Sequence, residues 1–221
     1  MVQVRLESNI LGANELLARK NQKHFADHGT LVVNMMSSPG SGKTTILERT
    51  IEGLSKSLKM AVIEGDLYTD QDARRIEQKG VRVVQINTEG ACHLDAGMVG
   101  RAFESLANEN LDLLFIENVG NLVCPAEFDL GEDFKVVVIS TAEGNDKPLK
   151  YPLIFREARA ILLNKIDLLP FTDFSVDRFR GDLDQINPQA PVFLVSGRTG
   201  EGVKDWIEWL LEEVKIKRAD V

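Results

Sequence analysis

The chain has 221 residues, of which 43% are hydrophobic, enough for one large domain with its own core. Its 34 acidic residues outnumber its 26 lysines and arginines, so the net charge of -8 argues against the basic surface that nucleic-acid binding needs. The sequence also lacks the long apolar run of a membrane span and the basic-then-apolar pattern of a secretory leader. We expect one domain, residues 1–221, in a cytoplasmic protein that binds neither nucleic acid nor membranes.

Strand and helix patterns alternate along the chain. Residues 8–28 predict a helix with Ser8 or Asn9 as N-cap and Gly29 as its end, so residues 1–29 are expected to be a helical appendage. The clearest later helices are 44–58 and 203–214. Short apolar runs predict strands at 31–36, 60–63, 81–86, 111–116, 135–140, 160–163 and 191–195. This order predicts a doubly wound α/β fold, with a mostly parallel sheet of about seven strands and helices on both faces.

The segment SSPGSGKTT, from Ser37 to Thr45, lies between the first predicted strand and the following helix. This arrangement is typical of a P-loop, whose backbone N–H groups surround a phosphate chain. Lys43 is expected to reach the β and γ phosphates, and Thr44 to bind Mg²⁺. The predicted nucleotide contacts here are Gly40, Ser41, Gly42, Lys43, Thr44 and Thr45. Ser37 replaces the glycine that opens the full pattern, and an ordinary glycine-rich turn is the alternative.

Acidic residues follow two of the predicted strands. Glu117 ends the fourth strand, where P-loop proteins keep an acid that organises Mg²⁺, and Gly120 is expected to sense the γ-phosphate. Glu117 could bind the ion directly, bind it through water, or position the attacking water. Glu64 and Asp66 follow the second strand, and Asp66 is the predicted switch residue near Mg²⁺, although a surface turn would look the same. The predicted catalytic residues are thus Lys43, Thr44, Asp66 and Glu117, and the last three are the predicted magnesium ligands.

The sixth predicted strand leads into Asn164-Lys165-Ile166-Asp167. The Asp167 carboxylate can accept from N1–H and the 2-amino group of guanine, whereas adenine offers neither donor at those positions. Asn164 can bond the O6/N7 edge, and the Lys165 stem can lie along the ring. Backbone N–H groups of Ser196 and Gly197 can donate to O6. We therefore predict GTP and GDP as ligands, with a helix cap or turn as the alternative role of Asp167.

Cys92 and Cys124 are the two cysteines of the chain. Cys92-His93 follows the third predicted strand and Cys124-Pro125 the fourth, so their loops leave the same edge of a parallel sheet. Two thiolates and an imidazole suit Zn²⁺ or Ni²⁺, with water, a carboxylate or a second subunit completing the coordination. Two structural cysteines are the alternative.

These motifs, together with residues 91–95, 123–125 and 141–148, resemble the HypB family of P-loop GTPases over nearly the whole chain. The resemblance implies a slow GTPase that helps deliver nickel to [NiFe] hydrogenases, with a nickel-delivery accessory protein and the hydrogenase large subunit as partners. It further implies that Cys92, His93 and Cys124 form the metal site, shared across a homodimer interface. Nucleotide state would then govern dimerisation, which GTP favours, and metal release.

Other functions fit parts of the sequence. The related urease accessory GTPases share the P-loop, but Cys-Pro-His is expected there in place of Cys92-His93. A P-loop small-molecule kinase would share it too, although Asp167 would be unusual in one. A third alternative is a constitutive dimer whose metal is purely structural, in which only the P-loop region would act as the switch. For the dimer contact, the apolar segment Leu168 to Phe171 either forms a surface patch or folds back under the next helix.

Overall fold

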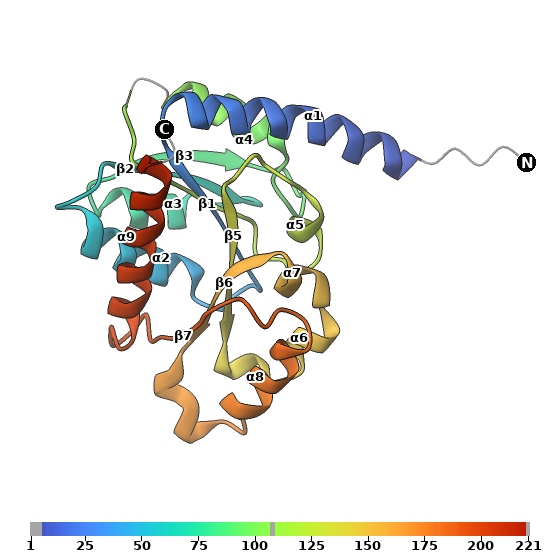
Figure 1. The fold of residues 1–221 in the computed structure, drawn as a ribbon, viewed down its shortest axis with the longest axis vertical. Coiled ribbons are helices and arrows are strands. Elements are labelled where there is room, and N and C mark those ends of the chain that lie inside the picture. Colours follow the sequence, from blue (N-terminus) through green and yellow to red (C-terminus); the bar gives the residue numbers. More distant parts are fainter. Residues whose placement is uncertain (1–5, 107–108, 220–221) are drawn as a thin grey trace, which may run out of the picture.

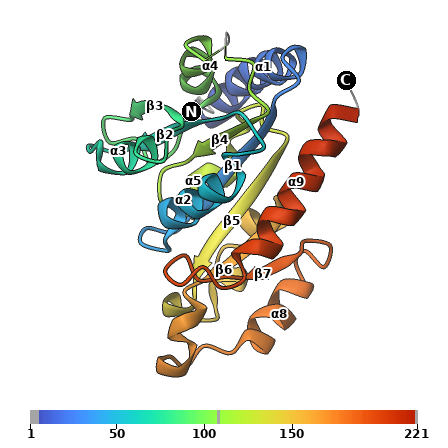
Figure 2. The same ribbon diagram turned by 90° about the vertical axis from the view of Figure 1, so that its left-hand side faces the viewer.

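The computed structural model describes residues 6–106 and 109–219. One sheet of parallel strands has the order β3-β2-β4-β1-β5-β6-β7, with helices on both faces (Figure 1 and Figure 2). The strands are β1 (Leu31–Ser37), β2 (Met60–Asp66), β3 (Arg82–Asn87), β4 (Leu113–Glu117), β5 (Phe134–Ser140), β6 (Ala158–Asn164) and β7 (Val192–Leu194). The predicted doubly wound α/β fold is confirmed.

The helices connect these strands and flank the sheet. They are α1 (Leu6–Asp27), α2 (Lys43–Leu54), α3 (Gln71–Glu77), α4 (Ala96–Glu104), α5 (Cys124–Glu127), α6 (Lys147–Lys150), α7 (Pro152–Arg156), α8 (Val176–Asp184) and α9 (Val203–Ala219), with 3₁₀ turns η1 (Thr141–Glu143) and η2 (Ile166–Phe171). Several predicted boundaries are wrong. Helix α1 begins before Ser8 and Asn9, and α2 ends at Leu54 because residues 55–57 form a turn that leads into β2. Helix α9 continues past residue 214 to Ala219, and β2 continues past residue 63 to Asp66. Within the described part of the chain, no helix combines the length and apolarity needed to cross a bilayer.

Strand side chains alternate between two apolar layers. In β1, Val33 and Met35 pack with α2 and α9, whereas Val32 packs with α1 and α4 on the opposite face. All seven residues of β1 are buried. A strand covered on both faces can be apolar throughout, which is why the sequence shows continuous apolar runs here.

Helix α1 packs along α4 on one face of the sheet. The Phe25 ring lies edge-to-face against Phe103 of α4, with ring centroids 4.7 Å apart. Asn21 donates to the carbonyls of Ala96 and Leu130, and Asn14 accepts the N–H of Ala96. The segment expected to be an appendage therefore contributes to the core. The single domain over residues 1–221 stays a prediction, and residues 1–5 lie outside the described part.

The carboxyl ends of β1, β2, β4 and β6 lie at one edge of the sheet. Strand β1 pairs with β4 on one side and β5 on the other, so the chain order reverses around it. In open parallel sheets, ligands bind at the carboxyl edge beside such a reversal. The loop after β1 is the predicted P-loop.

Candidate functional site: a P-loop cleft beside a thiol–imidazole cluster

The P-loop runs from the end of β1 at Ser37 to the first turn of α2 at Lys43. Gly40 and Gly42 have φ angles of 74° and 91°, the left-handed region that glycine adopts without strain. A Cβ added to Gly42 would also collide with the Asn164 amide. Position 42 therefore requires glycine on two independent grounds.

Lys43, Thr44 and Glu117 meet at the base of the cleft. The Lys43 Nζ and the Thr44 Oγ1 each lie 2.7 Å from the Glu117 Oε1. Glu117 is 1% exposed, and its charge is compensated by the Lys43 ammonium. Three of the four predicted catalytic side chains thus hold one another in place, two on α2 and one at the end of β4.

Glu64 lies next to Glu117, because the two residues are register partners on β2 and β4. Burial, with repulsion from Glu117 adding to it, raises the pKa of Glu64 to about 8. Among the described residues, the Oε2 atoms of Glu64 and Glu117 are buried and have no hydrogen-bond partner. These two oxygens, together with the Thr44 hydroxyl that donates to Glu117, are of the kind that Mg²⁺ prefers as ligands.

Asp66 ends β2 on the rim of the same cleft. One carboxylate oxygen accepts the N–H of Leu67 at 2.7 Å, and the other accepts the Thr69 hydroxyl at 2.6 Å. Partial burial opposes ionisation, but these hydrogen bonds outweigh it and hold the pKa of Asp66 below its ordinary value. Asp66 thus anchors a turn, and its predicted role as a switch residue near Mg²⁺ stays a prediction.

The cleft has a volume of about 520 Å³ and includes residues that the sequence patterns did not indicate. Asp72 and Arg75 of α3 line it, and the Arg75 guanidinium donates to the Asp72 carboxylate at 2.9 Å and to the Thr45 hydroxyl at 3.2 Å. No sequence motif marked α3, because its spacing is that of any short helix following a strand. Asn118 also lines the cleft, and its side-chain oxygen accepts the N–H of Leu94, close to Cys92 and His93 in the chain.

The predicted base-recognition residues bind the P-loop directly. Asn164 donates to the carbonyl of Ser41 at 2.8 Å and accepts the N–H of Gly197 at 2.9 Å. Lys165 has a φ of 62° and donates from Nζ to the carbonyl of Gly40 at 2.6 Å. The segment after β6 is therefore fixed against the loop that would hold the phosphates.

Asp167 accepts the Ser196 hydroxyl at 2.6 Å, which brings its carboxylate to the turn after β7. The backbone N–H groups predicted to reach guanine O6 already have partners, because that of Ser196 donates to the carbonyl of Glu201 and that of Gly197 to Asn164. Donation to a base would require either group to leave its present acceptor. Sequence patterns gave no sign of the pairing with Asn164, since that acceptor lies on another segment of the chain.

Cys92, His93 and Cys124 converge at the same edge of the sheet. Their potential ligand atoms all lie within 4.8 Å of one another, and the two sulfur atoms are 3.0 Å apart. Cys92 is exposed, Cys124 partly so, and the His93 ring packs on Phe128 with centroids 3.9 Å apart. The two cysteines are therefore not core residues, and three donors of a soft or borderline metal site lie together.

The protonation of these groups follows from their surroundings. The hydrogen bond with Cys92, aided by burial, raises the pKa of the Cys124 thiol. Burial lowers the pKa of His93, so its imidazole is neutral near pH 7 and one ring nitrogen carries a lone pair. A metal ion would therefore meet an imidazole ready to bind and a thiol that must lose its proton.

Phe171 ends η2, just beyond the base-recognition segment, and its side chain is 83% exposed. Leu168 in the same turn is half-buried. Phe171 does not fold back under α8, and the surface patch considered from the sequence stays a prediction.

The fold and the P-loop define a P-loop nucleotide-binding protein. The family described as CobW/HypB/UreG, nucleotide-binding domain, matches residues 31–194. The hydrogenase maturation factor HypB of Azotobacter chroococcum is 54% identical over 94% of this chain and 68% of that protein. The crystal structure of HypB from Helicobacter pylori in complex with nickel is 41% identical, with a TM-score of 0.88 over 93% of this chain and 97% of that one. The chain belongs to the HypB family of hydrogenase maturation factors, which confirms the resemblance.

The structure of HypB from Archaeoglobus fulgidus is also similar, with 39% identity and a TM-score of 0.86 over 92% of this chain and 99% of that one. A LAO/AO transport system kinase matches at 16% identity with a TM-score of 0.57, a likeness of fold alone. The kinase and urease-type alternatives are therefore not favoured.

Proposed function

We propose that this chain is a GTP-hydrolysing metallochaperone that assists nickel insertion into a [NiFe] hydrogenase. The observation that carries the proposal is that the nucleotide cleft and the thiol–imidazole cluster lie at the same edge of the sheet. The P-loop is hydrogen-bonded to the Asn164–Asp167 segment, and Cys92, His93 and Cys124 lie on the segments that follow β3 and β4.

Guanine selection rests on Asp167. Its carboxylate would accept from N1–H and the 2-amino group, while Asn164 and Lys165 hold the segment against the P-loop. The contact with the Ser196 hydroxyl orients the Asp167 carboxylate. The ligands expected are GTP and GDP, with Gly40 to Thr45 around the phosphates.

The change Asp167→Asn tests this assignment. An amide donor in place of a carboxylate acceptor should shift the preference from GTP toward xanthosine triphosphate, by ~10-fold or more in the ratio of turnover rates. The measurement is turnover of both nucleotides by the variant and the unaltered protein. Equal turnover of ATP and GTP by the unaltered protein would contradict guanine specificity.

Hydrolysis of GTP to GDP and phosphate is assigned to the side chains at the base of the cleft. Lys43 would neutralise charge on the β and γ phosphates, and Thr44, Glu117 and the rim residue Asp66 would hold Mg²⁺ or its water ligands. When bound, Mg²⁺ supplies stabilisation of the charge on the phosphate oxygens. The Arg75 guanidinium is engaged by Thr45, Glu48 and Asp72. Since Arg75, the arginine that lines the cleft in the described part of the chain, is already engaged, intrinsic turnover should be slow, ~10⁻⁴ to 10⁻² s⁻¹.

The metal carried is nickel, with zinc as a second ion that the same donors accept. Cys92, His93 and Cys124 supply three donors, which leaves a fourth position for water, a carboxylate or a partner subunit. The nickel in the Helicobacter pylori relative supports this assignment. The accessory protein that supplies nickel and the hydrogenase large subunit that receives it are the expected partners, in the cytoplasm, where thiols stay reduced.

A homodimer favoured by GTP is part of the proposal, with the exposed Phe171 and its neighbour Leu168 at the contact. The double change Leu168→Ala, Phe171→Ala should raise the dimer dissociation constant and leave GTP binding nearly unchanged. Sedimentation of the GTP-loaded variant measures this. If the variant forms a dimer as stable as that of the unaltered protein, the dimer interface does not include Leu168 and Phe171.

A further inference from the structure

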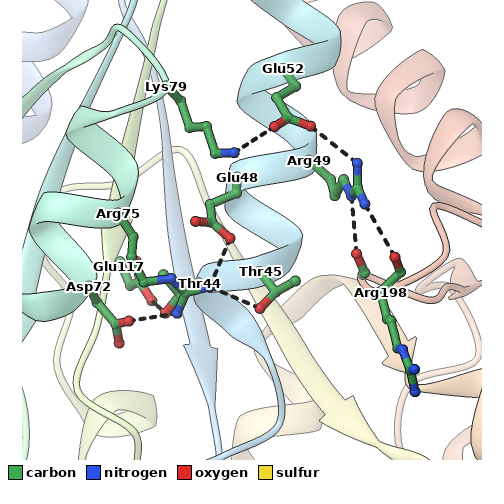
Figure 3. A network of polar contacts seen from close by, with 11 residues as sticks. Thr44, Thr45, Glu48, Arg49, Glu52, Asp72, Arg75, Lys79, Glu117 and Arg198 are labelled. Atoms are coloured by element: carbon green, nitrogen blue, oxygen red, sulfur yellow. Dashed lines mark hydrogen bonds and ion pairs between the residues drawn. The ribbon is translucent and has the colours of Figure 1, made fainter.

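Arg49 lies on the exposed side of α2 and reaches the turn that follows β7. Its Nε donates to the carbonyl of Gly197 at 3.1 Å, and its Nη2 donates to the carbonyl of Arg198 at 3.2 Å (Figure 3). Both acceptors belong to consecutive residues of one turn. A guanidinium fits such a pair because its N–H donors are fixed in one plane, whereas an ammonium is a single point charge.

The turn held by Arg49 contains partners of the base-recognition residues. The N–H of Gly197 donates to Asn164, and the Ser196 hydroxyl donates to Asp167. The turn also packs closely on α2, because a Cβ added to Gly197 would lie 3.0 Å from the Cγ2 of Thr45. Movement of this turn would therefore disturb Asn164 and Asp167 together.

A second set of contacts fixes the Arg49 side chain from outside. Its Nη1 lies 3.4 Å from a carboxylate oxygen of Glu52, whose other oxygen accepts the Lys79 ammonium at 2.7 Å (Figure 3). Glu52 and Arg49 are both on α2, and Lys79 follows α3. The guanidinium is thus held between an acidic partner and two carbonyls.

We propose that Arg49 is a positioning residue for guanine recognition: it ties the turn at Gly197 and Arg198 to α2, so that Asn164 and Asp167 are held at a fixed distance from the phosphate site. The first turn of α2 carries Lys43 and Thr44, and its second carries Arg49, so one helix sets the spacing between phosphates and base. Arg49 is not among the described residues that line the cleft. The inference rests on the proposed guanine specificity.

The test compares ligands that do and do not use the base pocket. The unaltered protein, Arg49→Gln and Arg49→Lys are titrated calorimetrically with GDP, ADP and inorganic pyrophosphate, each with Mg²⁺. We expect Arg49→Gln to raise the Kd for GDP about tenfold, to leave the Kd for pyrophosphate within about twofold, and to lower the preference for GDP over ADP, since two charge-assisted hydrogen bonds are lost. The Kd of Arg49→Lys for GDP should lie between that of the unaltered protein and that of Arg49→Gln.

Arg74→Gln is the matched control, because Arg74 lies on neighbouring α3, is exposed, and pairs with Asp70 away from the turn. It makes the same change of charge and should leave every Kd within about twofold. An unchanged Kd for GDP in Arg49→Gln, or equal weakening of GDP and pyrophosphate, would overturn the positioning role. If the unaltered protein itself does not prefer GDP to ADP, the proposed guanine specificity fails. That result comes from the unaltered protein, whereas failure of the positioning role is read from Arg49→Gln, so the two failures are distinguishable. If Arg49→Gln folds poorly, Arg49→Lys replaces it in the same titrations. A higher Kd for GDP with an unchanged Kd for pyrophosphate then supports the positioning role, and an unchanged Kd for GDP overturns it.

Discussion

The nucleotide cleft and the Cys92, His93 and Cys124 cluster share one edge of the sheet but differ in how their side chains are held. In the cleft, buried Glu117 binds Lys43 and Thr44, and groups from distant segments lock the loops together. In the cluster, Cys92 is exposed, and the contacts of the donor atoms are mainly with one another.

The two sites therefore differ in how far their side chains are ordered before a ligand binds. The cleft is pre-organised, so a phosphate chain meets donors whose ordering is already complete. In the cluster, Cys92 and His93 lie on the loop before α4 and Cys124 is the first residue of the short helix α5. Asn121 ties the two segments by donating to the carbonyl of Cys92. Under the proposed function, we expect such a site to release its ion with little cost to the fold. The predictions below test the contrast.

The largest effect is expected from Lys43→Ala. The change removes the cation that faces the phosphates and leaves the buried Glu117 beside Glu64 without it. Nucleotide affinity should fall by ~100-fold or more, and the free energy of unfolding by ~3 kcal/mol, because a buried charge loses its partner. Fluorescent GDP titration and urea unfolding measure the two. A variant with normal stability would show that the cleft is less interdependent than its contacts suggest.

A smaller and separable effect is expected for the cluster. Cys92→Ala and Cys124→Ala should each weaken Ni²⁺ or Zn²⁺ binding by ~10- to 100-fold, with His93→Ala less severe, because thiolates dominate affinity for these ions. The melting temperature of the metal-free variants should change by no more than ~2 °C, since exposed side chains contribute little to stability. Unchanged metal stoichiometry in the double cysteine variant would contradict the metal assignment.

The last effect, and the smallest when it is expressed per pH unit, is a pH dependence that arises in the cleft. Unfolded Glu64 releases its proton near its ordinary pKa of 4.5, whereas the folded protein keeps it up to about 8. Between these values the folded state binds more protons, so the Glu64 contribution to stability is complete below pH 4.5 and is lost as the pH rises toward 8. In urea unfolding without nucleotide or divalent ions, Glu64→Gln should lose less stability per pH unit than the unaltered protein, by at most ~1.4 kcal/mol. Parallel slopes in the two proteins would refute this assignment.

The sequence was sufficient for the sheet and for the segments at its carboxyl edge. Apolar runs such as 31–36 predicted strands because both faces of the sheet are covered. The glycines of the P-loop were recognisable because their backbone conformations exclude other residues. The predicted meeting of Cys92, His93 and Cys124 also holds, since loops after parallel strands leave the same edge.

Sequence reasoning failed where a role depends on a partner distant in the chain. Nothing local distinguishes Arg49 from any exposed helical arginine, because its acceptors are carbonyls of the turn after β7. The engagement of the Gly197 N–H by Asn164 was invisible for the same reason. Helix boundaries also shifted, because an N-cap preference is weak against the packing of a whole helix, as in α1.

Helix α1 has a consequence for anyone who shortens this protein. Ala96 is the first residue of α4 and follows His93 by three positions. The Asn14 side chain accepts the N–H of Ala96, and the Asn21 side chain donates to its carbonyl. A version beginning near residue 30 would remove both asparagine partners of Ala96 and uncover the Phe103 ring. We expect such a truncated chain to aggregate, and metal affinities measured on it would describe a damaged scaffold rather than the native loop.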